Sequence, residues 1–162
     1  MTKIIIGIDP GLQGGIAAIQ GTALLFVEKM PVINIASKRC IDGKKIAEYL
    51  KPLDKKNTKI YIERVHSFPN QGVTSMFTFG EGFGKILGVL EALEFEYEEI
   101  LPKTWQKTIY ANYEEPDKNT GAEIAKKLFP EANFQPGKMM KYHNGMTDAL
   151  MIALYGGYKE WG

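Results

Sequence analysis

Three acidic residues lie in apolar surroundings along this sequence, and their positions are the first indication of chemistry. Asp9 and Glu63 each close a β-branched, apolar run typical of a buried strand, whereas Asp148 begins an apolar run of helical character. A buried carboxylate without a partner is costly, so such an acid is expected to pair with a cation, bind a metal ion or be protonated. Only Glu63 has a neighbouring arginine, and on a strand that side chain would point to the opposite face. The pattern favours a metal site.

Carboxylate oxygens select hard cations, so the expected metal is Mg²⁺ or Mn²⁺. Two such ions about 3.5–4 Å apart can activate water and stabilise the leaving oxygen in phosphodiester hydrolysis. Two of the acids also have a plainer explanation. Asp9 precedes Pro10 and Gly11 as a turn residue would, and the helix macrodipole favours Asp148 in an early turn. The joint pattern of the three acids is more specific than its parts.

The elements that would position these acids follow from hydrophobic periodicity and from proline and glycine. Strands are expected at residues 3–9, 16–19, 22–28, 59–63 and 95–101, and helices at 44–50, 73–93, 102–110, 119–129 and 147–158. A polar connection containing Pro31 and Ser37 is expected before the first helix. This order predicts an α/β fold with a mixed central sheet and helices on both faces. Functional sites in such folds lie at strand ends, where Asp9 and Glu63 are found.

Length and composition predict a single domain, 1–162, because the chain has 162 residues and 44% hydrophobic content. Cys40 is the one cysteine, so an internal disulfide is excluded, and no cysteine and histidine cluster has zinc-site spacing. The N-terminus lacks the apolar stretch of a signal peptide, and no apolar run approaches the roughly 18 residues that span a bilayer. We expect a soluble protein of a reducing cytosol, without a membrane partner.

The charge balance gives a weaker signal. Lysine and arginine number 20 against 19 acidic residues, which excludes a strongly basic protein. Acids crowd between residues 91 and 99, and lysines recur between residues 103 and 141. One basic side of the molecule is therefore conceivable, although solvated lysines on helix faces are the plainer explanation.

Glycines interrupt the long helix expected at 73–93, at Gly80, Gly82, Gly84 and Gly88. Each would cost a helix about 1 kcal/mol relative to alanine, so close packing or a break must justify them. The series resembles a phosphate-binding loop only superficially, because the preceding strand and the later acid of a dinucleotide site are missing. We expect no organic cofactor, and we expect the glycines to pack across a two-fold dimer interface.

A set of short motifs in order gives the sequence a family resemblance. These are residues 8–11 (IDPG) with Gly14 and Gly15, 61–63 (YIE), Pro102 followed by 105–107 (WQK), 128–130 (LFP), and 143–145 (HNG) before 147–150 (TDAL). The sequence resembles the RuvC-type Holliday junction resolvases, most closely their phage-type relatives, over residues 3–155. The resemblance implies an RNase H-like fold, a homodimer, Mg²⁺ dependence, paired cuts across four-way DNA junctions, and a cytoplasmic place in a bacterial or phage-infected cell.

The resemblance also implies roles for individual residues. Asp9, Glu63 and Asp148 would be the metal-binding carboxylates. Many bacterial members have a fourth acid three residues before the last one, and here that position is Gly145. His143 or Asn144 is expected to complete the metal site instead, with His143 as ligand or general base. A histidine that caps the helix entrance is the alternative for His143, and whether Asn144 is native or an exchanged aspartate stays open.

Other matching positions would contact branched DNA. Lys107 and Lys118 correspond to basic residues beside the cleft, where they would neutralise phosphates, and Lys118 would also act at the scissile phosphate. The loop after Glu63 in the relatives inserts an aromatic wedge at the junction centre. The candidate wedge here is Phe68, with Phe77 or Phe79 as substitutes, and Asn70 and Gln71 just after it are also expected to contact DNA. The plainer explanations are solvated lysines and a phenylalanine packed under its own loop.

Three other functions are weighed against this one. An actin-like or sugar-kinase-like ATPase shares the first hairpin but needs two such domains, and only one fits this length. A non-catalytic junction-binding domain would gain nothing from acids beside phosphates. A branched-DNA nuclease that acts on forks or flaps remains open.

Overall fold

The computed structural model describes residues 2–65 and 70–162. Its centre is a five-stranded mixed sheet in the order β3-β2-β1-β6-β7. The strands are β1 (Ile4–Asp9), β2 (Gly15–Gln20), β3 (Ala23–Lys29), β6 (Thr58–Glu63) and β7 (Glu96–Ile100). β1 to β3 form an antiparallel meander, whereas β6 runs parallel to β1 and β7 runs parallel to β6. The central strands β1 and β6 are apolar and almost wholly buried, as expected for strands that are covered on both faces.

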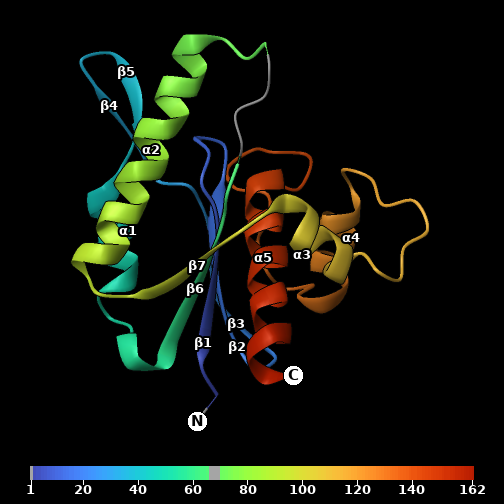
Figure 1. The fold of residues 1–162 in the computed structure, drawn as a ribbon. Helices are drawn as coiled ribbons and strands as arrows, with labels where there is room; N and C mark the ends of the chain where they lie inside the picture. The colour runs from blue at the N-terminus through green and yellow to red at the C-terminus, as the bar shows by residue number, and fades with distance from the viewer. Residues whose placement is uncertain (1, 66–69) are drawn as a thin grey trace.

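Helices cover both faces of the sheet, as predicted (Figure 1). One face packs against α5 (Asn144–Trp161), with α3 (Pro102–Ile109) and α4 (Thr120–Leu128) outside it, and the other packs against α1 (Gly43–Leu50) and α2 (Val73–Ala92). A short 3₁₀ turn, η1 (Lys55–Asn57), leads into β6. The sheet thus separates two hydrophobic clusters. No helix in the described ranges combines the length and hydropathy that crossing a membrane requires.

The helix α5 lies unusually close to the sheet. A Cβ atom at Gly7 of β1 would lie 2.1 Å from the carbonyl oxygen of Ala149 and 2.4 Å from the nitrogen of Ala153. Glycine is therefore required on β1 where the backbones of strand and helix meet. This close approach brings the first turns of α5 directly over the end of β1.

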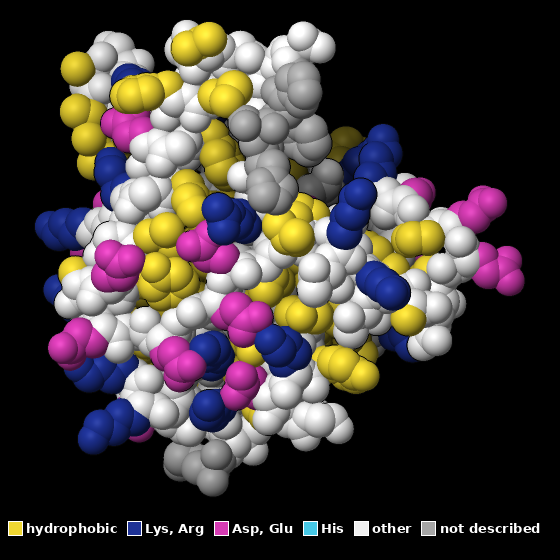
Figure 2. All heavy atoms as spheres, viewed as in Figure 1, with side chains coloured by type: hydrophobic (Ala, Val, Ile, Leu, Met, Phe, Trp, Pro, Cys, Tyr) yellow, Lys and Arg dark blue, Asp and Glu magenta, His cyan; other side chains and the backbone are white. Residues whose placement is uncertain are grey.

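Two expectations from the sequence are wrong in detail. The connection around Pro31 and Ser37 is a β-hairpin of β4 (Val32–Ile35) and β5 (Lys38–Ile41), closed by Ala36 and Ser37 at φ 48° and 66°. Two-residue hairpin loops need positive φ, but the usual asparagine or glycine signal is missing here. The last helix spans Asn144–Trp161 rather than 147–158. Apolar side chains stay exposed on β4 and at the start of α2, at the top of Figure 2.

Candidate active site at the ends of β1 and β6

Asp9 and Glu63 end neighbouring parallel strands and face α5. β1 and β6 pair in register from Ile4 with Thr58 to Ile8 with Ile62, which sets Asp9 beside Glu63. Gly7 lies against α5, and Tyr61 contacts it through Gly156 and Tyr155. Side chains two residues apart on a strand share a face. Both carboxylates therefore point to the α5 side of the sheet.

Asp148 reaches the same place from the first turns of α5. The turn after Asp9 packs against the start of this helix, because a Cβ at Gly145 would lie 2.1 Å from the carbonyl oxygen of Gln13 and 2.5 Å from that of Gly14. A fourth acid at position 145 would not fit this contact. The tight packing explains why Gly145 stands at that position and holds the helix start against the end of β1.

The electrostatics show that the three carboxylates are neighbours. Burial, with the negative charges of Glu63 and Asp148, raises the pKa of Asp9 from 3.8 to about 7. Burial and the charge of Glu63 raise the pKa of Asp148 to about 6. Burial also raises the pKa of Glu63, although a hydrogen bond from Trp105 opposes this. Arg64 does not neutralise Glu63, because its side chain lies 3.6 Å from Glu99. Within the described residues no lysine or arginine forms an ion pair with any of the three acids, and their burial favours the protonated carboxyl groups.

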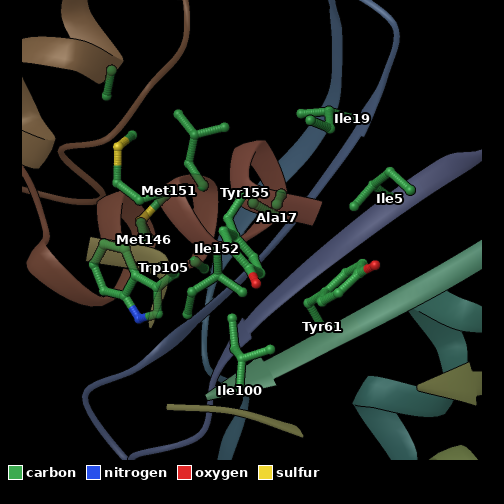
Figure 3. Packing of buried hydrophobic residues seen from close by; sticks show 14 of the residues in the cluster. Ile5, Ala17, Ile19, Tyr61, Ile100, Trp105, Met146, Met151, Ile152 and Tyr155 are labelled. Atoms are coloured by element: carbon green, nitrogen blue, oxygen red, sulfur yellow. The ribbon is translucent and has the colours of Figure 1, made fainter. Parts of the chain in front are cut away.

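Two aromatic residues support this site and were not singled out as functional from the sequence. The indole nitrogen of Trp105 donates a 2.6 Å hydrogen bond to Glu63 Oε2. Figure 3 shows Trp105 beside Ile152 and Met146 of α5, and the ring is almost fully buried. Tyr110 packs edge-on against Trp105, and burial together with Asp148 and Glu63 raises its pKa. The sequence signal for Trp105 was its place in the 105–107 motif (WQK), in the helix that follows β7, the strand next to β6.

The donor chemistry of this site fits a hard divalent cation. Three carboxylates with upward-shifted pKa values would ionise most readily beside such an ion. Within residues 2–65 and 70–162, however, no group of three or more His, Cys, Asp or Glu side chains is arranged so that it could hold a metal ion. Ligation by all three carboxylates would therefore require their side chains to adopt other positions than those described.

A pocket of about 560 Å³ opens beside the carboxylates, and Asp148 is part of its wall. Lys107 and Lys118 line it together with Lys103 and Asn144. The structure therefore brings both lysines that the sequence singled out, as well as Asn144, to the same hollow as one of the three acids. Their roles there stay predictions.

His143 immediately precedes α5 and caps it. Its Nδ1 accepts a hydrogen bond of 3.2 Å from the backbone N–H of Met146. Burial, with the positive charge of Lys29, lowers its pKa. The structure thus shows the capping arrangement that was the alternative for this residue. Because capping uses Nδ1, the other ring nitrogen is not engaged by it, and a catalytic role for His143 stays a prediction.

The proposed wedge residue Phe68 lies outside the described residues. Asn70, at φ 74°, and Gln71 precede α2 and are exposed. Of the two substitute aromatics, Phe77 is 70% exposed and lies under the Lys38 ammonium group, whereas Phe79 stacks on Phe83. Phe77 is thus the more exposed of the two, and a role as wedge stays a prediction for either.

Comparisons with known proteins give a match to structures only. No family model and no curated protein matches the sequence. A structure of Thermus thermophilus RuvC in complex with Holliday junction substrate is similar, with a TM-score of 0.69 and 16% identity over 99% of this chain and 96% of the other.

A second Thermus thermophilus RuvC structure has a TM-score of 0.61 and 18% identity over 96% of this chain and 93% of the other. The yeast mitochondrial Holliday junction resolvase has a TM-score of 0.54 and 13% identity over 99% of this chain and 79% of the other. The fold that the resemblance implied is thus confirmed: this chain has the RNase H-like fold of the RuvC structures.

Proposed function

We propose that this protein is a divalent-metal-dependent endonuclease that cuts four-way DNA junctions. One observation carries the proposal: Asp9, Glu63 and Asp148 come from β1, β6 and α5 to one place, where burial and, second to it, the neighbouring acids raise the pKa of Asp9 and of Asp148. A protein without a use for this arrangement would be more stable with neutral residues there. The preference for junctions is supported by the likeness to RuvC in complex with Holliday junction substrate.

The chain's own residues would act as follows. Asp9, Glu63 and Asp148 would hold Mg²⁺, with Mn²⁺ as a substitute, and the bound ions would supply Lewis acidity to the scissile phosphate. Trp105 fixes Glu63 by its 2.6 Å hydrogen bond. Lys107 and Lys118, in the wall of the pocket with Asp148, would hold the cleaved strand through its phosphates.

A homodimer would supply the two active sites that paired cuts require. Along α2, a Cβ atom at Gly80, Gly84 or Gly88 would meet nothing within 4 Å, whereas one at Gly82 would lie 2.8 Å from Ile41 Cγ1. Packing inside the chain thus explains Gly82 but not the other three. The open glycines recur every four residues on one face of α2, and exposed apolar residues Val73, Met76 and Phe77 precede them. We propose that this face of α2 packs against a second copy of the chain.

Cleavage of defined DNA substrates tests the proposal. A four-way junction, a flap, a fork and a linear duplex of the same sequence are each incubated with the protein in Mg²⁺, in Mn²⁺ and in EDTA. We expect symmetrical paired cuts in the junction only when a divalent cation is present. Equal cutting of flaps and forks would replace junction resolution by a broader branched-DNA activity. Binding without cutting in either metal would leave only a junction-binding protein.

Sedimentation of wild type and Gly84→Leu tests the dimer. We expect wild type to sediment as a dimer at micromolar concentration, and the leucine, which projects from the open face of α2, to weaken association without changing the fold. Gly82→Ala is the contrasting variant, because its methyl group meets Ile41 inside the chain and should lower stability rather than association. A wild-type monomer, with and without junction DNA, contradicts the dimer.

A further inference from the structure

A second pocket, of about 610 Å³, lies beside the one that contains Asp148, and the proposed mechanism does not use it. It is bounded by α4, by the start of α5 and by residues 139–142. Lys118 and Asn144 line both pockets, so the two hollows are neighbours. A chain-like ligand bound at Asp148 would therefore reach this second pocket directly.

The charged wall of the second pocket suits an anion. Lys118, Lys126 and Lys141 line it, and within the described part of the chain none of the three is ion-paired with an acid. Glu123 is the one acid in the lining. The lining thus carries an excess of positive charge that is free to attract a phosphate.

The rest of the wall suits a base and a sugar. Met139 and Tyr142 supply apolar surface, and Gln13 supplies an amide. The ring of Tyr142 stacks on the buried Phe134 at 5.4 Å between centroids, with an angle of 21° between the planes. This stacking fixes the tyrosine from behind. Lysines beside an apolar surface and a few hydrogen-bonding groups are the combination that binds single nucleotides of a strand.

A third hollow also adjoins the pocket that contains Asp148. A pocket of about 850 Å³ along the outer side of α3 shares Lys103 and Lys107 with the pocket that contains Asp148. The pocket that contains Asp148 thus shares lining residues with each of the other two hollows, and lysines line all three. This arrangement fits a polymer with regularly spaced phosphates better than a small anion or a free nucleotide.

We propose that the pocket formed by Lys126, Met139, Lys141 and Tyr142 is a nucleotide subsite for the cleaved DNA strand, next to the scissile phosphate. The lysines bind the phosphate of this nucleotide, and the methionine and tyrosine contact its sugar and base. Glu123 and Gln13 are placed to accept or donate hydrogen bonds at the base edge. The inference rests on the proposed function, because the strand enters the pocket from the carboxylate site.

Neighbouring lysines provide a matched test. Lys127 follows Lys126 in the sequence, and Lys138 lies three positions before Lys141; both are exposed, and neither lines the pocket. The double variant Lys126→Ala/Lys141→Ala and the control Lys127→Ala/Lys138→Ala remove the same charge. Their affinity for a four-way junction is measured over a range of salt, in Ca²⁺ in place of Mg²⁺. We expect the pocket variant to bind the junction at least about tenfold more weakly than the control. The slope of log affinity against log salt concentration should fall by about two released counterions, one for each lysine contact with phosphate that is lost.

Neutral methylphosphonates then locate the contact. We expect one such replacement next to the cleavage position to weaken binding of wild type and of the control, and not to weaken the pocket variant further. Equal affinities for both double variants, or additive losses at every phosphate, would overturn the subsite. Failure of the proposed function gives a different result, because wild type then binds the junction without cutting it. The affinities of the two double variants still show whether the pocket binds DNA. A wild type that binds no DNA overturns both.

Discussion

Two charged regions of this molecule differ in whether their lysines form ion pairs. Around the lower part of the sheet and the end of α5, acids and lysines alternate on the surface (Figure 2) and form ion pairs, which join Lys3 to Glu160, Lys55 to Glu94, Lys59 to Glu96 and Lys159 to Glu98. Around α3, α4 and the start of α5, the pocket-lining residues Lys103, Lys107, Lys118, Lys126 and Lys141 form no ion pair within the residues described.

The difference shows where the molecule keeps charge for external ligands. Paired charges cancel locally and contribute little to stability at an exposed surface. Unpaired lysines keep their attraction for phosphates, and three mutually repelling carboxylates keep theirs for cations. The formal net charge of +1 conceals this arrangement, because the count sums both regions. Substitutions on the two sides are therefore expected to act on different properties.

The largest effect is expected at the carboxylates. Asp9→Asn, Glu63→Gln and Asp148→Asn should each lower junction cleavage at least about 10³-fold while junction binding persists, because each removes a negative charge that the metal ions need. Single-turnover cleavage with a gel readout measures this. Glu94→Gln, which only breaks the ion pair with Lys55, is the control and should cut at the wild-type rate. A carboxylate variant that cuts normally would refute the metal site.

The next largest effect is expected at the lysines beside the site. Lys107→Ala and Lys118→Ala should each lower the cleavage rate about 10-fold to 100-fold, because a cation beside the scissile phosphate stabilises developing charge. Lys55→Ala removes a paired lysine from the other region and should leave cleavage unchanged. If Lys55→Ala slows cleavage as much as the other two variants, the net charge of the protein governs activity. The position of a lysine in one region or the other would then not matter for cleavage.

His143 caps α5 and is also a candidate for catalysis. Replacing it by another residue that caps helices well separates these two roles. Asparagine is a good N-cap, so His143→Asn should keep the stability of α5, whereas His143→Ala should lose about 0.5–2 kcal/mol. We expect His143→Asn to lower cleavage about tenfold, because the imidazole no longer serves the reaction. Rates in Mg²⁺ and in Mn²⁺ from pH 6 to 9 measure this. Wild-type rates and pH profiles for His143→Asn in both metals would leave His143 a capping residue alone.

Stability without metal should depend on pH through the carboxylates. The unfolded chain loses the Asp9 proton near pH 3.8 and the folded chain near pH 7, so the free energy of unfolding falls as pH rises through this window. Asp148, with its pKa of about 6, adds to the same trend. In EDTA at pH 8, Asp9→Asn should therefore be more stable than wild type, by roughly 1–3 kcal/mol, with the gain shrinking toward pH 4.

Thermal unfolding measures this gain, which corresponds to roughly 2–4 °C in Tm for each kcal/mol. Added Mg²⁺ should raise the Tm of wild type and not that of Asp9→Asn. A wild type that becomes more stable with rising pH in EDTA would contradict the burial and mutual repulsion of the carboxylates.

The smallest effect is expected at the paired surface. Lys159→Met breaks the ion pair with Glu98 and should change the free energy of unfolding by less than about 1 kcal/mol, because exposed ion pairs are screened and cost side-chain entropy. Denaturant unfolding in low and high salt measures it. A loss well above this value would mean that the paired region contributes to stability more than its exposure indicates.

The sequence by itself determined the types of the main elements and the positions of the carboxylates within them. Apolar runs of strand type end at Asp9 and Glu63. Because those runs are buried, the acids lie at the carboxyl ends of the strands. Periodicity is a local property, so it predicted the mixed sheet with helices on both faces. It failed at the β4–β5 hairpin, whose loop lacks the usual turn residues, and at the start of α5.

Only the tertiary structure decided how these parts act on one another. The hydrogen bond from Trp105 to Glu63 joins residues 42 positions apart, and the raised pKa of Asp9 depends on its burial and on acids from two other elements. Whether a lysine is paired also depends on which acid the fold brings near it, as Glu98 lies near Lys159. Such contacts arise between distant segments, and the energies that govern pKa values and ion pairs fall with distance in space, which local sequence patterns do not encode.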